Sequence, residues 1–344
     1  MTLAQRIYGQ LPNGQEVEAY LLKNEQGMSV EFLNYGGIIT KILVPDKEGK
    51  IQNIVLGHQS LAPYLADKAY LGALIGRFAN RVGKGSFFLE GKKYQLSVNH
   101  GNHHLHGGFI GYDKVIWDCE PIKDSASIAV KLTYSSPHLE EGFPGNLKLS
   151  VTYRLTHNNQ FHVSYEAQTD RATPVNLTQH SYFNLSGNVN ETIFDHRLAI
   201  FADLYLETDK ALIPTGKLLT VDNTAYEFRV PRDIGASIIR NNSAEEKIRG
   251  YDLCYALTPS KGDLQLAARL VHPNSGRVLE VKTNTPGIQF YTPSHLAAPF
   301  VNYGGLCLET QFFPDSPNQP NFPSTILMPG EIFLSETQFN FLVL

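Results

Sequence analysis

Four of the chain's 12 histidines fall within the run Asn99-His100-Gly101-Asn102-His103-His104-Leu105-His106-Gly107-Gly108. In an extended segment the side chains of His104 and His106 would point to the same side, with Leu105 on the other. Two imidazoles in this spacing could hold a metal ion or exchange protons with a ligand near neutral pH. A solvated, histidine-rich loop is the third interpretation of the same residues.

Two further segments each carry one group that can take or give a proton. His180 lies in residues 176–185, where polar and apolar residues alternate as in a strand that faces a wet cavity. Glu309 lies in residues 305–311, where two leucines predict a buried face and place the carboxylate on the opposite face. A carboxylate within an apolar strand needs a partner, so a buried salt bridge competes with a role in catalysis. A structural role likewise competes for His180.

Residues 76–85 hold two arginines, Arg77 and Arg81, beside Asn80 and three glycines. The lysine of this run precedes glycine rather than Ser or Thr, so the run does not match a phosphate-binding P-loop. Two neighbouring guanidinium groups suit paired hydrogen bonds to a carboxylate or to sugar hydroxyls. Structural ion pairs explain the arginines equally well.

Two acidic or amide side chains stand among aromatic residues, Asp252 in residues 251–255 and Gln289 in residues 287–292. Aromatic faces mixed with Asp, Gln, Asn and Arg are typical of sugar sites, because sugars offer faces to stack on and hydroxyls to pair. The chain lacks GxSxG, HExxH and a GxGxxG that follows a strand. Serine-nucleophile, zinc-protease and nicotinamide chemistry therefore lose support.

The composition and spacing predict strands to carry these groups. The 344 residues include 17 Tyr, 19 Phe, 28 Gly and 19 Pro but only 3 Met, which favours strands and turns. Alternation with period two predicts strands over 128–134, 147–155 and 161–165, the last two joined by a polar turn. Further strands are expected near residues 30–32, over 87–96 folded at Glu90-Gly91, and over 264–270, 278–281 and 332–344. We expect few helices and a large antiparallel β-sandwich or barrel that hides its strand edges, as one domain over residues 1–344.

The net charge and the positions of the cysteines argue against several classes of protein. With 29 Lys and Arg against 33 Asp and Glu the formal charge is −4, so no nucleic-acid partner is expected. Cys119, Cys254 and Cys307 lie far apart without a CxxC pair, which argues against a disulfide framework and a zinc site. No apolar stretch suits a signal peptide or a membrane span, so we expect a cytoplasmic protein without a membrane partner, as a monomer or a homodimer.

Together these blocks resemble the aldose 1-epimerase, or galactose mutarotase, family. The blocks occur in family order and span most of the chain, which makes the match far more specific than any single block. They are residues 76–81, 104–108, 179–185, 251–252, 287–291 and 309–323.

The resemblance implies a galactose mutarotase-like sandwich with an open cleft. Its activity would be interconversion of the α and β anomers of free hexoses such as galactose and glucose, with no cofactor and no metal. Carried over by motif, Glu309 is the general base, His180 the general acid and His106 a second imidazole at the ring oxygen. Leu253 and Phe312 depart from the family pattern, which leaves the preferred sugar open. The residues expected to bind the substrate are Asn80, Arg81, His106, Tyr182, Asp252 and Gln289.

The chemistry supports an acid and base pair independently of the family. To open a hemiacetal, the C1 hydroxyl must lose a proton while the ring oxygen gains one. We expect Arg81 or a protonated imidazole to keep Glu309 ionised, and its charge to raise the pKa of His180. Two alternatives stay open: a glycoside hydrolase with Asp252 and Glu309 as paired carboxylates, and a non-catalytic carbohydrate-binding or metal-bearing sandwich built on the histidine run.

Overall fold

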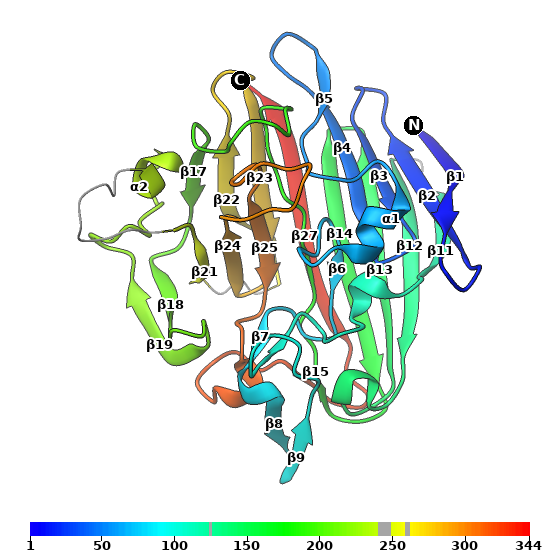
Figure 1. Cartoon of the computed structure of the whole chain (residues 1–344), viewed down its shortest axis with the longest axis vertical. Coiled ribbons are helices and arrows are strands. Elements are labelled where there is room, and N and C mark those ends of the chain that lie inside the picture. Colours follow the sequence, from blue (N-terminus) through cyan, green and yellow to red (C-terminus); the bar gives the residue numbers. More distant parts are fainter. Residues whose placement is uncertain (124–125, 240–248, 259–261) are drawn as a thin grey trace.

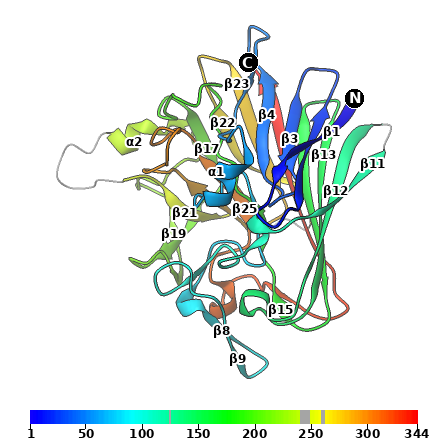
Figure 2. The ribbon, with the colours of Figure 1, turned by 45° about the vertical axis from the view of Figure 1, so that its right-hand side comes forward.

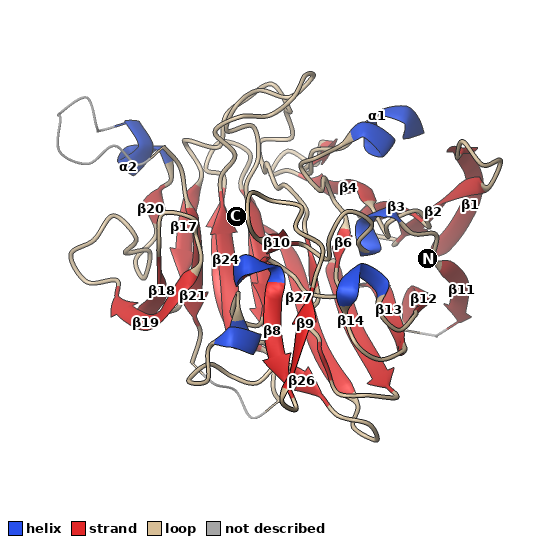
Figure 3. Ribbon diagram, turned by 60° about the horizontal axis from the view of Figure 1, so that its bottom comes forward, coloured by secondary structure: helices blue, strands red, loops and turns tan. Residues whose placement is uncertain are grey.

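Strands dominate the structure, a computed structural model that describes residues 1–344 except 124–125, 240–248 and 259–261. Figure 3 shows helices only as short segments beside the sheets, as the composition predicts. None of the helices in the described ranges is long and apolar enough to cross a membrane. The helices of these ranges are α1 (Leu61–Ala66), α2 (Gly235–Ile239) and the 3-10 turns η1 (Gly83–Gly85), η2 (Tyr112–Lys114), η3 (Glu140–Gly142) and η4 (Ser316–Asn318).

The largest sheet runs across the whole molecule (Figure 1). Among the described residues it has nine strands, and each pairs with its neighbours in antiparallel fashion. In spatial order they are β11 (Asp118–Lys123), β12 (Ser127–Ser136), β13 (Leu147–Thr156), β14 (Gln160–Thr169), β27 (Phe333–Val343), β23 (Arg277–Thr283), β22 (Gln265–Val271), β17 (Arg197–Ile200) and β20 (Arg232–Asp233).

Two smaller antiparallel sheets, each of five described strands, pack against the large one (Figures 1 and 2). The first lies at the amino-terminal end of the chain and the second contains the strands of the predicted sugar site. The first sheet is β1 (Thr2–Gln10), β2 (Glu16–Lys23), β3 (Ser29–Leu33), β4 (Ile39–Pro45) and β5 (Ile51–Asn53). The second, in spatial order, is β19 (Pro214–Thr220), β18 (Leu204–Thr208), β21 (Asp252–Ala256), β24 (Gly287–Tyr291) and β25 (Cys307–Gln311).

The structure also contains four two-stranded ribbons in its described residues. Two of them, β7 with β10 and β6 with β16, carry residues of the predicted site or lie next to them. The ribbons pair β7 (Arg81–Val82) with β10 (His104–Leu105), β6 (Leu74–Ile75) with β16 (Thr178–Gln179), β8 (Ser86–Leu89) with β9 (Lys92–Gln95), and β15 (Thr173–Pro174) with β26 (Ile326–Leu327).

Side-chain alternation along the strands creates the core between the sheets. In β13 the residues Leu149, Val151 and Tyr153 are buried while the residues on either side of each are half-buried or exposed, as period-two patterning requires. The ring of Tyr153 meets Phe32 of the first small sheet edge to face, with centroids 4.9 Å apart. Phe290 of the second small sheet belongs to the same apolar cluster. The predicted antiparallel sandwich is therefore confirmed.

Two local predictions have different outcomes. The 87–96 hairpin forms as β8 and β9, and its turn residues Glu90 and Gly91 both have positive φ, 49° and 75°, as a two-residue hairpin turn needs. The strand predicted over residues 176–185 is wrong for most of its length, since only β16 has strand geometry there. Beyond β16 the backbone bonds to separate segments instead of one continuous strand, as with the Phe183 amide and Leu306.

The two neighbouring arginines have different environments, and Arg77 is structural. Its side chain is buried, and its Nη1 donates to the carbonyl oxygens of Pro144 and Gly145 at 2.8 and 3.0 Å. The same atom reaches Thr173 Oγ1 at 3.2 Å, while Nη2 donates to Ser136. One guanidinium thus ties the segment that leads to the predicted site to two other parts of the fold.

We predict that Arg77→Leu lowers the free energy of unfolding by about 3 kcal/mol or more, because several buried carbonyl groups lose a charged donor together. Urea unfolding followed by circular dichroism measures this change. The matched variant Arg171→Leu removes an exposed arginine and should change the unfolding free energy by no more than about 0.5 kcal/mol. Equal effects of the two variants would contradict the structural role of Arg77.

Candidate active site

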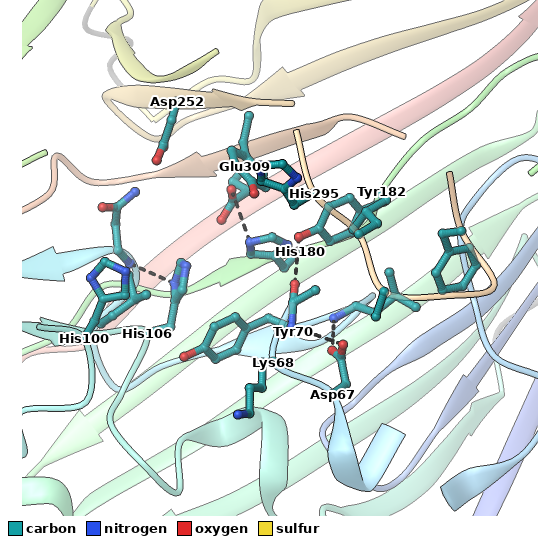
Figure 4. Close-up of a pocket in the computed structure, with 18 of the residues that line it drawn as sticks. Asp67, Lys68, Tyr70, His100, His106, His180, Tyr182, Asp252, His295 and Glu309 are labelled. Carbon is teal, nitrogen blue, oxygen red and sulfur yellow. Dashed lines mark hydrogen bonds and ion pairs between the residues drawn. The ribbon is translucent and has the colours of Figure 1, made fainter. Parts of the chain in front are cut away.

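One cavity of about 380 Å³ collects most of the predicted site residues from distant parts of the chain (Figure 4). It brings together the end of the 76–81 run, the histidine run and strands β21 and β25. Of the predicted residues, those that line it are Asn80, Arg81, His106, His180, Tyr182, Asp252 and Glu309.

Glu309 and His180 face each other inside this cavity. The distance between His180 Nε2 and Glu309 Oε1 is 3.6 Å, and the two side chains are only 5% and 2% exposed. Glu309 Oε2 has no hydrogen-bond partner among the described residues. The Sγ of Cys307, two residues before Glu309 on β25, lies 3.5 Å from His180 Nδ1. The buried carboxylate therefore lies next to an imidazole in the lining of the cavity.

Burial governs the ionisation of this pair. Desolvation raises the pKa of Glu309 well above its ordinary range, and nearby Asp252 raises it further while Arg81 lowers it. Desolvation also lowers the pKa of His180 to about 4. Both groups thus favour their neutral forms. This corrects the expectation that Glu309 is held ionised and that its charge raises the pKa of His180.

His106 has a defined tautomer. Its Nδ1 accepts a hydrogen bond from the backbone N–H of Asn80 at 3.1 Å, so the proton of the neutral ring resides on Nε2. Its ring centroid lies 5.3 Å from that of His180, at an interplanar angle of 83°. Burial, followed by the charges of His180 and Arg81, lowers the pKa of His106 well below its ordinary value. His106 is therefore a neutral N–H donor beside the Glu309 and His180 pair.

The tautomer of His106 also bears on metal binding. Potential ligand atoms of His106, His180 and Glu309 lie within 4.8 Å of one another. To bind a metal ion through Nε2, His106 would have to give up its Nε2 proton, either by becoming an anion or by losing the hydrogen bond from the Asn80 N–H. The site is better suited to proton exchange than to a metal.

The expected pairing of His104 with His106 is wrong. His104 is fully buried outside the cavity, where its ring packs against Phe143 at 5.2 Å and its Nδ1 lies 2.8 Å from the carbonyl oxygen of Ser97. The reason is the backbone of His106, whose φ of 50° breaks the alternation of an extended strand. The two imidazoles consequently occupy separate environments.

A second group of potential metal ligands consists of Asp195, His196 and His272, which are joined by hydrogen bonds. His196 Nε2 accepts from the Leu185 N–H at 2.9 Å, and His272 Nδ1 accepts from the Ser275 N–H at 3.2 Å. The remaining nitrogens therefore carry protons, and each lies 3.2 Å from the Asp195 carboxylate. These bonds use both nitrogens of each ring, which leaves no lone pair for a cation.

A polar network forms one side of the cavity. Arg81 Nη2 lies 3.3 Å from Asp252 Oδ2, and Arg81 Nη1 donates to Asn80 Oδ1 at 3.3 Å. Gln289 Nε2 donates to Asp252 Oδ1 at 2.6 Å. Gln289 lies behind Asp252 and is not part of the cavity lining. Asp252 is therefore oriented from two sides, with Gln289 as its support.

Several lining residues escaped the sequence analysis. Tyr291 and His100 lie in segments whose other residues were predicted to belong to the site. Tyr70 lies in none of those segments. Tyr182, which was expected to bind substrate, donates its hydroxyl to the Ala69 carbonyl at 2.8 Å and so offers the cavity its ring. The additional lining residues are His58, Asp67, Lys68, Ala69, Tyr70, Leu71, His100, Leu105, Tyr291, His295, Leu296, Ala297 and Phe300.

Comparison with known proteins agrees with this geometry. The profile of the family described as Aldose 1-epimerase matches residues 18–340. The chain belongs to the aldose 1-epimerase family. It is 42% identical to the galactose mutarotase of Mus musculus over 352 aligned residues, covering 100% of this chain and 99% of the relative. It is 35% identical to the aldose 1-epimerase of Escherichia coli K12, covering 96% and 97% of the two chains.

A solved relative confirms the architecture. The crystal structure of galactose 1-epimerase from Lactobacillus acidophilus superposes with a TM-score of 0.87 at 32% identity, covering 99% of both chains. The predicted family, the galactose mutarotase-like β-sandwich and the assignment to aldose 1-epimerases, which are isomerases, are thus confirmed.

We predict that Glu309→Gln stabilises the protein increasingly as the pH rises. A carboxyl group whose pKa is higher in the folded than in the unfolded chain contributes most stability below its unfolded pKa, and that contribution is lost as the pH rises. The amide does not titrate, so the melting temperature of the variant relative to wild type should be higher at pH 8 than at pH 5.

Differential scanning fluorimetry across this pH range measures the difference. Glu48→Gln replaces an exposed carboxylate and should show a nearly constant difference. If Glu309→Gln behaved like Glu48→Gln, the raised pKa of Glu309 would be refuted.

Proposed function

We propose that this aldose 1-epimerase opens and closes its sugar ring with Glu309 as general base and His180 as general acid. The observation that carries the proposal is their buried contact: the two side chains lie 3.6 Å apart although they are 129 positions apart in the chain (309 − 180). A base and an acid on one bound ring are what hemiacetal opening requires.

The proposed reaction moves two protons. Glu309 takes the proton of the C1 hydroxyl as C1–O1 becomes a carbonyl. The bond between C1 and the ring oxygen breaks, and its electron pair stays on the ring oxygen, which takes a proton from His180. His106, as a neutral N–H donor, hydrogen-bonds to the same oxygen. Rotation about C1–C2 followed by the reverse transfers closes the other anomer.

In the wild-type protein, Glu309 and His180 must share one titratable proton for this cycle to begin. Because burial favours neutral Glu309 and neutral His180, the reactive form arises when the carboxyl proton moves to the imidazole. Arg81 lowers the pKa of Glu309 and so favours that transfer. No cofactor takes part in this proposal.

The hydroxyl groups of the sugar would bind on the polar side of the cavity. Asn80, Arg81 and Asp252 supply amide, guanidinium and carboxylate groups there. Gln289 would act through Asp252, and Tyr182 through its ring. We infer a free hexose such as galactose or glucose as the substrate, which the names of the mouse and bacterial relatives support.

The remaining features fit a reducing environment and one folding unit. All three thiols, of Cys119, Cys254 and Cys307, are unpaired, and we therefore propose a cytoplasmic protein. One apolar cluster contains side chains of all three large sheets, which supports a single domain over residues 1–344. We propose a monomer or a homodimer as the assembly.

We predict that Glu309→Gln and His180→Gln each lower kcat by about 10²- to 10⁴-fold, the contribution typical of one general acid or base. Polarimetry on freshly dissolved α-galactose and α-glucose measures the rate of anomer equilibration, and circular dichroism checks folding. Glu48→Gln should retain wild-type activity. Full activity of Glu309→Gln would remove Glu309 as the base, and release of aryl alcohol from an aryl galactoside would favour a hydrolase instead.

We also predict an unusually broad pH range of activity. The reactive pair carries one proton, so kcat/KM should fall on the acid side near pH 4, as His180 gains a second proton, and on the alkaline side at the raised pKa of Glu309. If the carboxyl group and the imidazole had ordinary pKa values and titrated independently, activity would instead be confined to about pH 4.3–6.5. Polarimetry between pH 3.5 and 9 distinguishes the two cases, and a steep loss of activity through pH 6.5 would contradict the prediction.

A further inference from the structure

Tyr70 adopts a backbone conformation that is unusual for a large aromatic residue. Its φ is 55°, in the left-handed region, where an L-residue other than glycine pays about 1–2 kcal/mol. Asn80 and His106, with φ of 64° and 50°, line the same cavity. Asparagine and histidine adopt this region more readily than other residues, so the strain is greatest at Tyr70, which indicates that the fold holds its side chain there against local preference.

A set of hydrogen bonds fixes the Tyr70 segment. The Asp67 carboxylate accepts the backbone N–H groups of Ala69 and Leu71 at 3.1 and 2.8 Å, which closes the turn around Tyr70. This turn places the Tyr70 side chain in the cavity (Figure 4).

The same segment is bonded directly to the His180 segment. The Gly72 N–H donates to the His180 carbonyl at 3.0 Å, and the His180 N–H donates to the Ala73 carbonyl at 2.9 Å. The Tyr182 hydroxyl binds the Ala69 carbonyl at 2.8 Å. The position of Tyr70 is thereby fixed relative to the proposed acid.

The ring of Tyr70 contacts both candidate imidazoles. Its centroid lies 4.7 Å from that of His106, at an interplanar angle of 61°, and 6.1 Å from that of His180, at 35°. The Lys114 ammonium lies 5.4 Å from the Tyr70 ring centroid. One aromatic ring therefore packs beside two imidazoles that are themselves nearly perpendicular.

We propose that Tyr70 is a positioning residue for epimerisation: its ring holds the planes of His106 and His180 in the orientation that presents both to the sugar beside Glu309. The inference rests on the proposed function of those three residues. The ring has this role because it is the part of Tyr70 that packs beside both imidazoles.

Three substitutions at one position test the role of the ring. Tyr70→Phe should keep kcat within about threefold of wild type. Tyr70→Ala and Tyr70→Gly should each lower kcat by about 10- to 100-fold, the scale expected for misplaced catalytic groups, with KM changed by less than about threefold. Glycine adopts positive φ at a lower cost than alanine, so the two variants should differ in melting temperature but share the same loss of kcat.

The chain offers a matched control. Tyr303 is also left-handed, with φ of 57°, but it packs against Phe194 outside the cavity lining. Tyr303→Ala should lower the melting temperature and leave kcat unchanged. Histidine side-chain NMR adds an independent readout, since the ring signals of His106 and His180 should shift in Tyr70→Ala and not in Tyr70→Phe.

Three outcomes would overturn the inference. These are wild-type kcat in Tyr70→Ala, a rise in KM alone, and a kcat that follows melting temperature across the Gly and Ala variants. Its failure is distinguishable from that of the proposed function. If Glu309→Gln is inactive while Tyr70→Ala keeps kcat, only the role of Tyr70 fails, whereas a fully active Glu309→Gln refutes the acid and base assignment itself.

Discussion

The site depends on one constraint: a carboxyl group and an imidazole must contact each other in a place that is shielded from water. Glu309 and His180 are almost completely buried and 3.6 Å apart. Water would keep a carboxylate ionised and an imidazole partly protonated near neutral pH, but burial moves both toward neutrality. Their pKa values therefore differ from those of exposed side chains because of their location, and the surrounding sheets must hold that location firmly.

The sandwich meets this demand by bringing rigid strands and bonded turns to one cavity. Glu309 is at the centre of β25, with Gln289 opposite it on β24, and Asp252 on β21 is oriented by both Arg81 and Gln289. The His180 segment is irregular, yet its backbone is bonded to neighbouring segments on both sides of the histidine. Irregular backbone is tolerated at this depth because its polar groups find partners. The backbone hydrogen bonds of the His180 segment thus position the site as much as the regular strands do.

The sequence predicts what local pattern determines. The alternation in β13 and the Glu90-Gly91 turn depend on neighbouring residues, and both are visible in the chain. Family motifs likewise predict Glu309 and His180 as site residues, and both line the cavity. The separation of His104 from His106 could not be predicted, because the positive φ of His106 is imposed by tertiary contacts such as the bond from Asn80. The direction of the pKa shifts was also out of reach, since desolvation depends on burial in the completed fold. Tyr70 has no local signal at all, because its importance lies in two rings that are distant in sequence.

The preference of the buried pair for neutrality has a consequence for the proposed reaction. When the sugar ring opens, Glu309 has gained a proton and His180 has lost one, so the enzyme is then in the neutral form that burial favours. The closed ring, in contrast, reacts from the ionised form, which burial disfavours. Desolvation therefore lowers the free energy of the complex with the open-chain aldehyde relative to the ionised closed-ring complex. Because the resting pair is also neutral, the free energy needed to form the ionised pair adds to the barrier, and groups that favour ionised Glu309, such as Arg81, reduce it. Closure on either face restores the starting protonation, so the same pair serves both anomers.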